Sequence, residues 1–206
     1  MKRLDDVILR IGAMRVSSHV NGPGKRLVLW LQGCNMACRG CFNTEFHDPH
    51  GGMDISADKI LYTAIFSGVE GLTFTGGEPF LQAAALSELA AAARQKGLGI
   101  VCYSGFYLDE IIRNKMPGES ELLEVTDLLI DGPFIRERQG AFAWRGSSNQ
   151  NLRCLTERYR QAVQEVWAKG VSQTEILVGN SEVAITGIFP LEFWQRLEQK
   201  LNASAQ

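Results

Sequence analysis

Three cysteines, Cys34, Cys38 and Cys41, lie within a segment of eight residues. A loop this short can fold all three sulfur atoms around one inorganic centre without straining the backbone. Thiolates select zinc, copper(I) or iron–sulfur clusters. No fourth cysteine lies nearby, so one coordination position of such a centre would stay open, which is typical of catalytic rather than structural sites. The spacing therefore predicts a metal centre that performs chemistry.

Two other interpretations of the cysteine triplet stay open. A structural zinc ion could bind the three thiolates with His47 or His50 as its fourth ligand. The triplet could also be three unrelated cysteines, because free cysteine is often buried. The two remaining cysteines are expected to be passive thiols, Cys102 inside a strand-like run and Cys154 at the start of a helical one.

A glycine turn lies about 35 residues downstream of the cysteine triplet, in the segment Thr75-Gly76-Gly77-Glu78-Pro79. It closes a strand predicted at 71–75, and the triplet closes a strand predicted at 26–32. Alone, the turn could be a simple β-turn. Glycines have no Cβ, so the backbone at Gly76 and Gly77 could instead approach a bound molecule closely.

Together these two motifs resemble the radical S-adenosylmethionine superfamily. The resemblance rests on Cys-x₃-Cys-x₂-Cys followed by the aromatic Phe42, and on the glycine turn behind it. It implies a [4Fe–4S] cluster on the three cysteines, with S-adenosylmethionine bound through its amine and carboxylate to the open iron. It also implies that the cluster reductively cleaves this cofactor to a 5′-deoxyadenosyl radical.

The same resemblance assigns roles to individual residues around S-adenosylmethionine. Phe42 is expected to pack on the adenine, with the backbone of Gly40 and Cys41 nearby. The turn at Gly76 and Gly77 would lie against the methionine moiety, and Glu78 would help to hold its ammonium group.

Three further segments indicate a branch of the superfamily. Residues 21–26 resemble the entry loop of glycyl-radical-enzyme activases, although they could form an ordinary turn. Residues 131–134 and 144–150 resemble the end of the anaerobic ribonucleotide reductase activase, although they could be a strand end and a polar loop. This resemblance implies a protein partner whose glycine loses a hydrogen atom, and a flavodoxin- or ferredoxin-like electron donor.

Two alternatives to an activase remain. One is a radical S-adenosylmethionine enzyme that modifies a peptide or a small molecule, for example in the manner of 7-carboxy-7-deazaguanine synthase. The other is a non-catalytic metal-binding interaction module.

Alternating strands and helices must position these motifs. Strands are predicted at 7–16, 26–32, 71–75, 99–103 and 125–130, and helices at 56–66, 81–96 and 108–114. Such alternation favours βαβ units and a parallel sheet. With the resemblance, it predicts an α/β fold, an incomplete parallel (β/α) barrel whose site lies at the carboxyl ends of the strands.

A C-terminal extension is predicted beyond this core. We expect residues 1–150 to form the radical S-adenosylmethionine core, and 151–206 to form an extension packed on it. The extension is predicted as a helix at 153–169, a β-hairpin at 175–188 and a helix at 191–201. Candidate contacts with a partner are the hairpin tip at 179–182 and the aromatic residues Phe189, Phe193 and Trp194, which could equally be core residues.

The composition excludes other classes of protein. With 21 Lys+Arg against 23 Asp+Glu, the net charge is −2, without the basic excess that general nucleic-acid binding would need. The longest apolar run in the first half, 27–31, is far too short to span a membrane. Asp5 and Asp6 interrupt any signal peptide, so we expect a cytoplasmic protein with no membrane contact.

Overall fold

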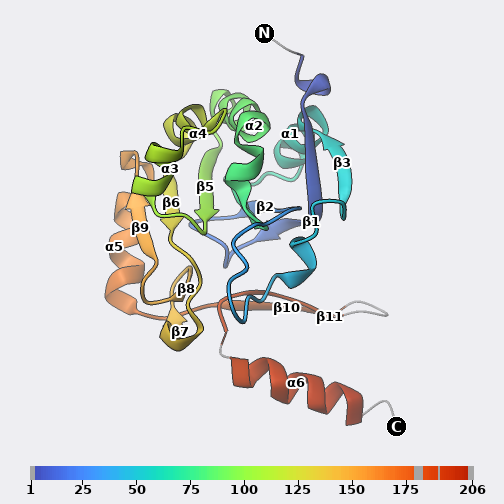
Figure 1. The fold of residues 1–206 in the computed structure, drawn as a ribbon, viewed down its shortest axis with the longest axis vertical. Helices are drawn as coiled ribbons and strands as arrows, with labels where there is room; N and C mark the ends of the chain where they lie inside the picture. Colours follow the sequence, from blue (N-terminus) through green and yellow to red (C-terminus); the bar gives the residue numbers. More distant parts are fainter. Residues whose placement is uncertain (1–2, 179–182, 190, 204–206) are drawn as a thin grey trace.

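The computed structural model describes residues 3–178, 183–189 and 191–203 (Figure 1). The strands are β1 Ile8–Ser18, β2 Arg26–Leu31, β3 Met53–Ser56, β4 Gly71–Gly76, β5 Gly99–Ser104, β6 Leu128–Asp131, β7 Gln139–Phe142, β8 Arg145–Ser147, β9 Asn151–Cys154, β10 Thr174–Val178 and β11 Val183–Gly187. The α-helices are α1 Ala57–Phe66, α2 Ala83–Gln95, α3 Leu108–Asn114, α4 Glu119–Val125, α5 Arg160–Lys169 and α6 Leu191–Ala203.

One large mixed sheet organises the chain, in the order β3-β1-β2-β4-β5-β6-β9. Its centre, β2-β4-β5-β6, is parallel. Antiparallel strands flank this centre, with β1 and β3 on one side and β9 on the other. The α/β class and the parallel sheet centre predicted from the sequence are confirmed.

The helices α1 to α4 cover one face of the sheet, in the upper part of Figure 1. In β2, every second residue points into this layer, so that Leu27, Leu29 and Leu31 are fully buried. Ser56 caps α1, because its side chain accepts a hydrogen bond from the Lys59 backbone N–H. This layer forms the main hydrophobic core.

The opposite face of the sheet is covered in two different ways. Near the start of the parallel strands, α5 packs on a small apolar cluster that includes Val101, Ile130 and Trp144. Further along, near the carboxyl ends, the β10–β11 hairpin lies across the sheet, opposite α1 to α4 in Figure 1. A cavity lies between the sheet and this hairpin.

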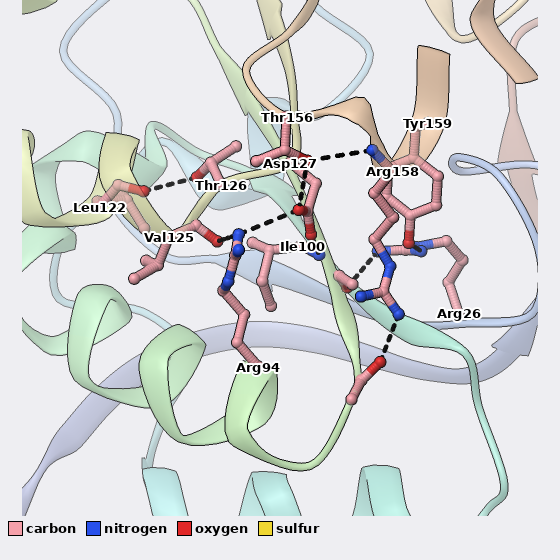
Figure 2. Close-up of polar contacts among 12 residues, drawn as sticks. Arg26, Arg94, Ile100, Leu122, Val125, Thr126, Asp127, Thr156, Arg158 and Tyr159 are labelled. Atoms are coloured by element: carbon pink, nitrogen blue, oxygen red, sulfur yellow. Dashed lines mark hydrogen bonds and ion pairs between the residues drawn. The ribbon is translucent and has the colours of Figure 1, made fainter. Parts of the chain in front are cut away.

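A buried polar network joins the amino ends of the parallel strands (Figure 2). The Arg26 guanidinium is completely buried and donates to Thr73, Tyr159 and the backbone oxygens of Pro23, Leu72 and Gly99. These bonds connect β2, β4 and β5 to the residues just before α5. Because every polar nitrogen of the guanidinium has an acceptor, this network favours stability.

A second hub of the network is Asp127, directly before β6. Its carboxylate accepts from the Ile100 backbone N–H at 2.8 Å, the Thr156 hydroxyl at 2.7 Å and the Arg94 guanidinium at 3.0 Å, as Figure 2 shows. Asp127 therefore ties α2 and the residues after β9 to the start of β5.

The structure corrects the predicted helix at 153–169. Residues 151–154 form the edge strand β9, and the helix begins only at Arg160. Arg153 forms an ion pair with the buried Asp131 of β6 at 2.8 Å, so a neighbouring strand decides the conformation of this polar segment. Cys154 accordingly ends a strand and does not begin a helix.

Several short elements have no counterpart in the prediction. The strand predicted at 125–130 begins only at Leu128, because Val125 ends α4 and residues 126–127 connect the helix to the strand. The short strands β3, β7 and β8 were not predicted from the sequence either. Each is at most four residues long, too short for an alternating pattern to be visible.

The hairpin strands β10 and β11 pair antiparallel, from Thr174 opposite Gly187 to Val178 opposite Val183. The predicted hairpin tip at 179–182 and the side chain of Trp194 lie outside the described residues. None of the described helices combines the length and the apolar character that crossing a membrane requires.

Candidate functional site

The cysteine loop starts directly after β2 and is held by backbone hydrogen bonds. The Gly33 N–H donates to the Phe46 oxygen at 2.8 Å, and the Cys34 N–H donates to the His47 oxygen at 3.1 Å. The Gln32 side chain adds bonds to the backbone oxygens of Glu45 and Asp48. These contacts fold residues 43–48 back against the end of β2, so the loop between them must bulge out over the sheet.

The three predicted cysteines are brought together. Cys34, Cys38 and Cys41 are free, partly buried thiols that line the same cavity. Burial raises the pKa of the Cys34 and Cys41 thiols, and the neighbouring thiols raise both further. Three thiolates in the lining of one cavity need a cationic centre to stabilise them. The donor set therefore fits an iron–sulfur cluster bound through sulfur.

The zinc interpretation needs a histidine beside the three cysteines. Across the described ranges, no three His, Cys, Asp or Glu side chains lie close enough together to share one metal ion. Neither His47 nor His50 lines the cavity.

The glycine turn joins the ends of β4 and β2. The Gly77 N–H donates to the Leu31 oxygen at 2.8 Å, and the Glu78 N–H donates to the Gly33 oxygen at 2.9 Å. A Cβ on Gly77 would lie 2.2 Å from that same Gly33 oxygen, and one on Gly76 would lie 2.5 Å from the Trp30 Cα. Both glycines are thus required by the neighbouring strand, whatever binds beside them.

Glu78 is buried at the same strand ends. Its carboxylate accepts from the Phe80 N–H at 3.0 Å, the Ser104 hydroxyl at 3.0 Å and the Gly105 N–H at 2.7 Å. Burial raises its pKa to about 7 despite these bonds. Both oxygens therefore tie β4 to the end of β5. That Glu78 also holds an ammonium group stays a prediction.

Phe42 lies in an aromatic cluster at the rim of the cavity. Its ring contacts Phe134, which follows β6, at 5.7 Å between centroids, and Phe189, which follows β11, at 5.4 Å. The ring is 38% exposed and lines the cavity. Gly40 has a positive φ of +77° and lies beside Arg136, outside the cavity lining.

The cavity has a volume of about 1040 Å³, which is large enough for a nucleoside-sized cofactor together with part of a substrate. Sequence reasoning missed several of its walls, among them Trp30, Tyr103 and the hairpin residues 184–188. For Trp30 a signal was available. It alternates with Leu29 and Leu31, which enter the core, so it must face the other side of β2.

Comparison with known proteins gives a consistent result. The family described as a 4Fe-4S single cluster domain matches residues 20–153. The anaerobic ribonucleoside-triphosphate reductase-activating protein of Enterobacteria phage T4 is 31% identical over 140 residues, which is 65% of this chain and 86% of that protein. Its namesake in Haemophilus influenzae is 31% identical over 141 residues, 64% of this chain and 88% of that protein.

Two further matches cover only about half of the matched protein. Pyruvate formate-lyase 1-activating enzyme of Escherichia coli is 32% identical over 130 residues, 60% of this chain but only 51% of that protein. The crystal structure of QueE from Escherichia coli gives a TM-score of 0.43 at 17% identity, over 50% of this chain and 55% of that one.

The cysteine triplet, the glycine turn and the parallel sheet that carries both define a radical S-adenosylmethionine protein with a 4Fe-4S single cluster domain. Within that superfamily, the chain belongs to the family of the anaerobic ribonucleoside-triphosphate reductase-activating proteins. Its cofactors are a [4Fe–4S] cluster and S-adenosylmethionine.

Proposed function

We propose that this chain is an activase that installs a glycyl radical on a partner enzyme such as an anaerobic ribonucleotide reductase. One observation carries the proposal: a single cavity is lined by all three cysteines and by the glycine turn, at the carboxyl ends of adjacent parallel strands. The reductase-activating relatives support this assignment, because the match covers 86% and 88% of their length.

In this proposal the thiolates of Cys34, Cys38 and Cys41 hold the cluster. When bound, the reduced cluster and S-adenosylmethionine would supply the radical chemistry that removes a hydrogen atom from the partner's glycine. The chain's own residues would bind and orient the reactants. The turn at Gly76 and Gly77 would border the methionine end and Phe42 would border the adenine, since all three residues line the cavity. The electron would come from a flavodoxin- or ferredoxin-like donor.

The rim of the cavity would protect this chemistry from solvent. Phe42, Phe134 and Phe189 come from three distant parts of the chain and meet edge to face. A radical in an open cleft would react with unintended groups, whereas apolar walls exclude water and restrict access. The aromatic cluster would therefore act as a barrier between the reactants and bulk solvent.

We further propose that the part of the chain beyond residue 150 contributes to the choice of partner. The β10–β11 hairpin lies outside the family match, which ends at residue 153, yet it lines the cavity with Leu177, Ile185 and Ile188. A substrate segment in the cavity would touch this wall. Relatives that lack an equivalent wall would accept the segment differently.

The function is tested with protein reconstituted anaerobically with iron and sulfide. With reductant and S-adenosylmethionine, it should form 5′-deoxyadenosine and methionine, and adding the reductase should give the glycyl-radical signal in electron paramagnetic resonance. The Cys38→Ala variant serves as the matched negative control. Cleavage of S-adenosylmethionine without any radical on the reductase would redirect the assignment to another substrate. Absence of cleavage would contradict the enzyme assignment itself.

A further inference from the structure

Arg15 on β1 is a cation in the cavity wall without an ion-pair partner among the described residues. It lines the cavity, and its Nε atom is buried without a hydrogen-bond partner. Over residues 3–178, 183–189 and 191–203, no side chain forms an ion pair with Arg15. Arginine normally uses its planar set of donors fully where it is buried. A guanidinium in a cavity wall, with a buried unpartnered Nε and no ion pair among the described residues, therefore has donors left for a ligand.

The direction of the side chain follows from the strand register. Arg15 lies opposite Val28, and Ala13 lies opposite Trp30. Residues directly opposite each other in an antiparallel pair share a face of the sheet. Arg15 therefore belongs to the face that carries Trp30 and the cavity, and not to the face that packs on α1 and α2.

The charges around the cavity identify the kind of ligand. Among the described residues that line it, Arg15 is the only basic one, and Glu45 and Glu78 are the acidic ones. The three cysteines add negative charge when they are ionised. An anionic group entering this cavity thus has one complementary partner, and a planar carboxylate matches the guanidinium with two parallel hydrogen bonds.

The position of Arg15 favours a carboxylate of the substrate over that of S-adenosylmethionine. Its partner Val28 precedes the end of β2 at Leu31 by three residues, which corresponds to about 10 Å along a strand. The cysteine loop begins beyond that end. A group held at the open iron would therefore lie near the strand end, whereas Arg15 lies further back along the sheet in the cavity wall.

We propose that Arg15 binds a carboxylate of the molecule that fills the cavity, namely an acidic side chain near the target glycine of the partner polypeptide. This inference rests on the proposed activase function and names a recognition contact within it. The methionyl carboxylate of S-adenosylmethionine is the other possible source of the same chemical group.

The probes are two end-capped tripeptides, glutamyl-glycyl-glutamate and its glutamine twin, which differ only in their side-chain carboxylates. Binding of each peptide and of S-adenosylmethionine is measured calorimetrically on the oxidised, cluster-loaded protein. The variants are Arg15→Gln and Arg15→Lys. Arg113→Gln on the exposed surface of α3 is the matched control for loss of one positive charge.

We expect the wild-type protein to bind the glutamate peptide at least tenfold more tightly than its twin. Arg15→Gln should lose this preference, Arg15→Lys should keep part of it, and Arg113→Gln should keep all of it. Binding of S-adenosylmethionine should change less than twofold in all variants. If Arg15→Gln instead weakens S-adenosylmethionine tenfold and leaves peptide binding unchanged, the carboxylate is that of S-adenosylmethionine and the substrate assignment is overturned.

If Arg15 had a structural role instead of a binding role, its substitution would change protein stability and not peptide binding. Glu175 on β10 also has a buried oxygen without a partner, and its other oxygen accepts from the His19 N–H at 2.6 Å. If Arg15 served mainly to hold this strand, Arg15→Gln would lower the melting temperature of the ligand-free protein by several degrees, and the proposal would be wrong. No difference between the two peptides on the wild-type protein would also overturn it. Failure of the activase function itself would show separately, as no glycyl radical on the reductase.

Discussion

The two ends of the parallel strands differ in how their polar groups are bonded. At the amino ends, Arg26 makes five hydrogen bonds and Asp127 accepts three, all within the protein. At the carboxyl ends, three free thiols face a cavity and Glu78 has its pKa raised to about 7. In the wall of the same cavity, the Nε atom of Arg15 is buried without a hydrogen-bond partner among the described residues.

Within this one sheet, the amino ends of the strands therefore contribute mainly to stability and the carboxyl ends to function. A buried polar group that is fully bonded stabilises the fold, whereas one left without a partner destabilises it and persists where a ligand supplies the missing contact. Parallel sheets of this kind place their sites at the carboxyl ends of the strands. Substitutions at the two ends should accordingly affect different measurements.

The largest expected effect is complete loss of the cluster at the carboxyl ends. Replacing Cys34, Cys38 or Cys41 by Ala should reduce the content from about four irons and four sulfides per chain to a small fraction of that. The stability of the metal-free protein should change by less than about 1 kcal/mol, because these thiols are only partly buried. Iron and sulfide analysis after anaerobic reconstitution measures the first effect, and urea unfolding measures the second.

Cys102→Ala and Cys154→Ala are the matched controls and should keep the full cluster. Stoichiometric zinc without sulfide in anaerobically prepared protein would contradict the cluster assignment.

Gly77→Ala tests whether the close approach of β4 to the end of β2 is needed for stability as well as for the site. Its Cβ would lie 2.2 Å from the Gly33 oxygen, so the ends of β2 and β4 must separate. We expect a loss of at least about 3 kcal/mol in unfolding free energy, together with impaired cluster binding, because the cysteine loop starts at the displaced strand end. Circular dichroism and iron analysis on one preparation measure both.

Gly97→Ala provides the comparison for Gly77→Ala. Gly97 has a φ of +81° but open space around its Cβ position, so Ala there should cost only about 1 kcal/mol. Equal effects at both positions would show that the contact with Gly33 is unimportant.

Asp127→Ala should destabilise the hydrogen-bond network at the amino ends of the parallel strands without affecting cluster binding. It leaves the Ile100 N–H and the Thr156 hydroxyl without their acceptor and removes the ion pair with Arg94. We expect a loss of about 3 kcal/mol in unfolding free energy, while the surviving folded protein still binds a full cluster. Asp54→Ala removes an exposed ion pair with Arg10 and should cost less than about 1 kcal/mol.

The smallest effect concerns the pH dependence of stability. Burial raises the pKa of Glu78 from 4.5 to about 7, so the folded protein binds its proton more tightly than the unfolded chain does. The resulting stability is present at low pH and is lost as pH rises from about 4.5 to about 7. Between pH 5 and 7.5 this group should remove about 2 kcal/mol of unfolding free energy.

Urea unfolding of the wild-type protein and of Glu78→Gln at these two pH values isolates the contribution, because other titrating groups cancel. The variant should show a flatter pH dependence, even if it is less stable throughout. An identical slope in both proteins would mean that Glu78 is ionised throughout the range.

Much of the site could be predicted because its chemistry is local. The spacing of Cys34, Cys38 and Cys41 confines three thiols to one loop, and the glycine turn closes the next strand of the sheet. The reason for Gly77 could not be predicted in the same way. The residue was expected to leave room for a ligand, but the structure shows the Gly33 backbone in that space.

The sequence by itself determined the cysteine loop, the buried strand β2 and the α/β class, because each depends on residue types at short spacings. Only the tertiary structure decided the contacts between distant segments, such as the bond from Arg26 to Tyr159 and the bond from Asn21 to Thr186. The bonded residues are 133 and 165 positions apart in the sequence, too far for any local sequence pattern to predict the contact. Such contacts arise when the sheet sets the register and the remaining segments pack where buried donors still need acceptors.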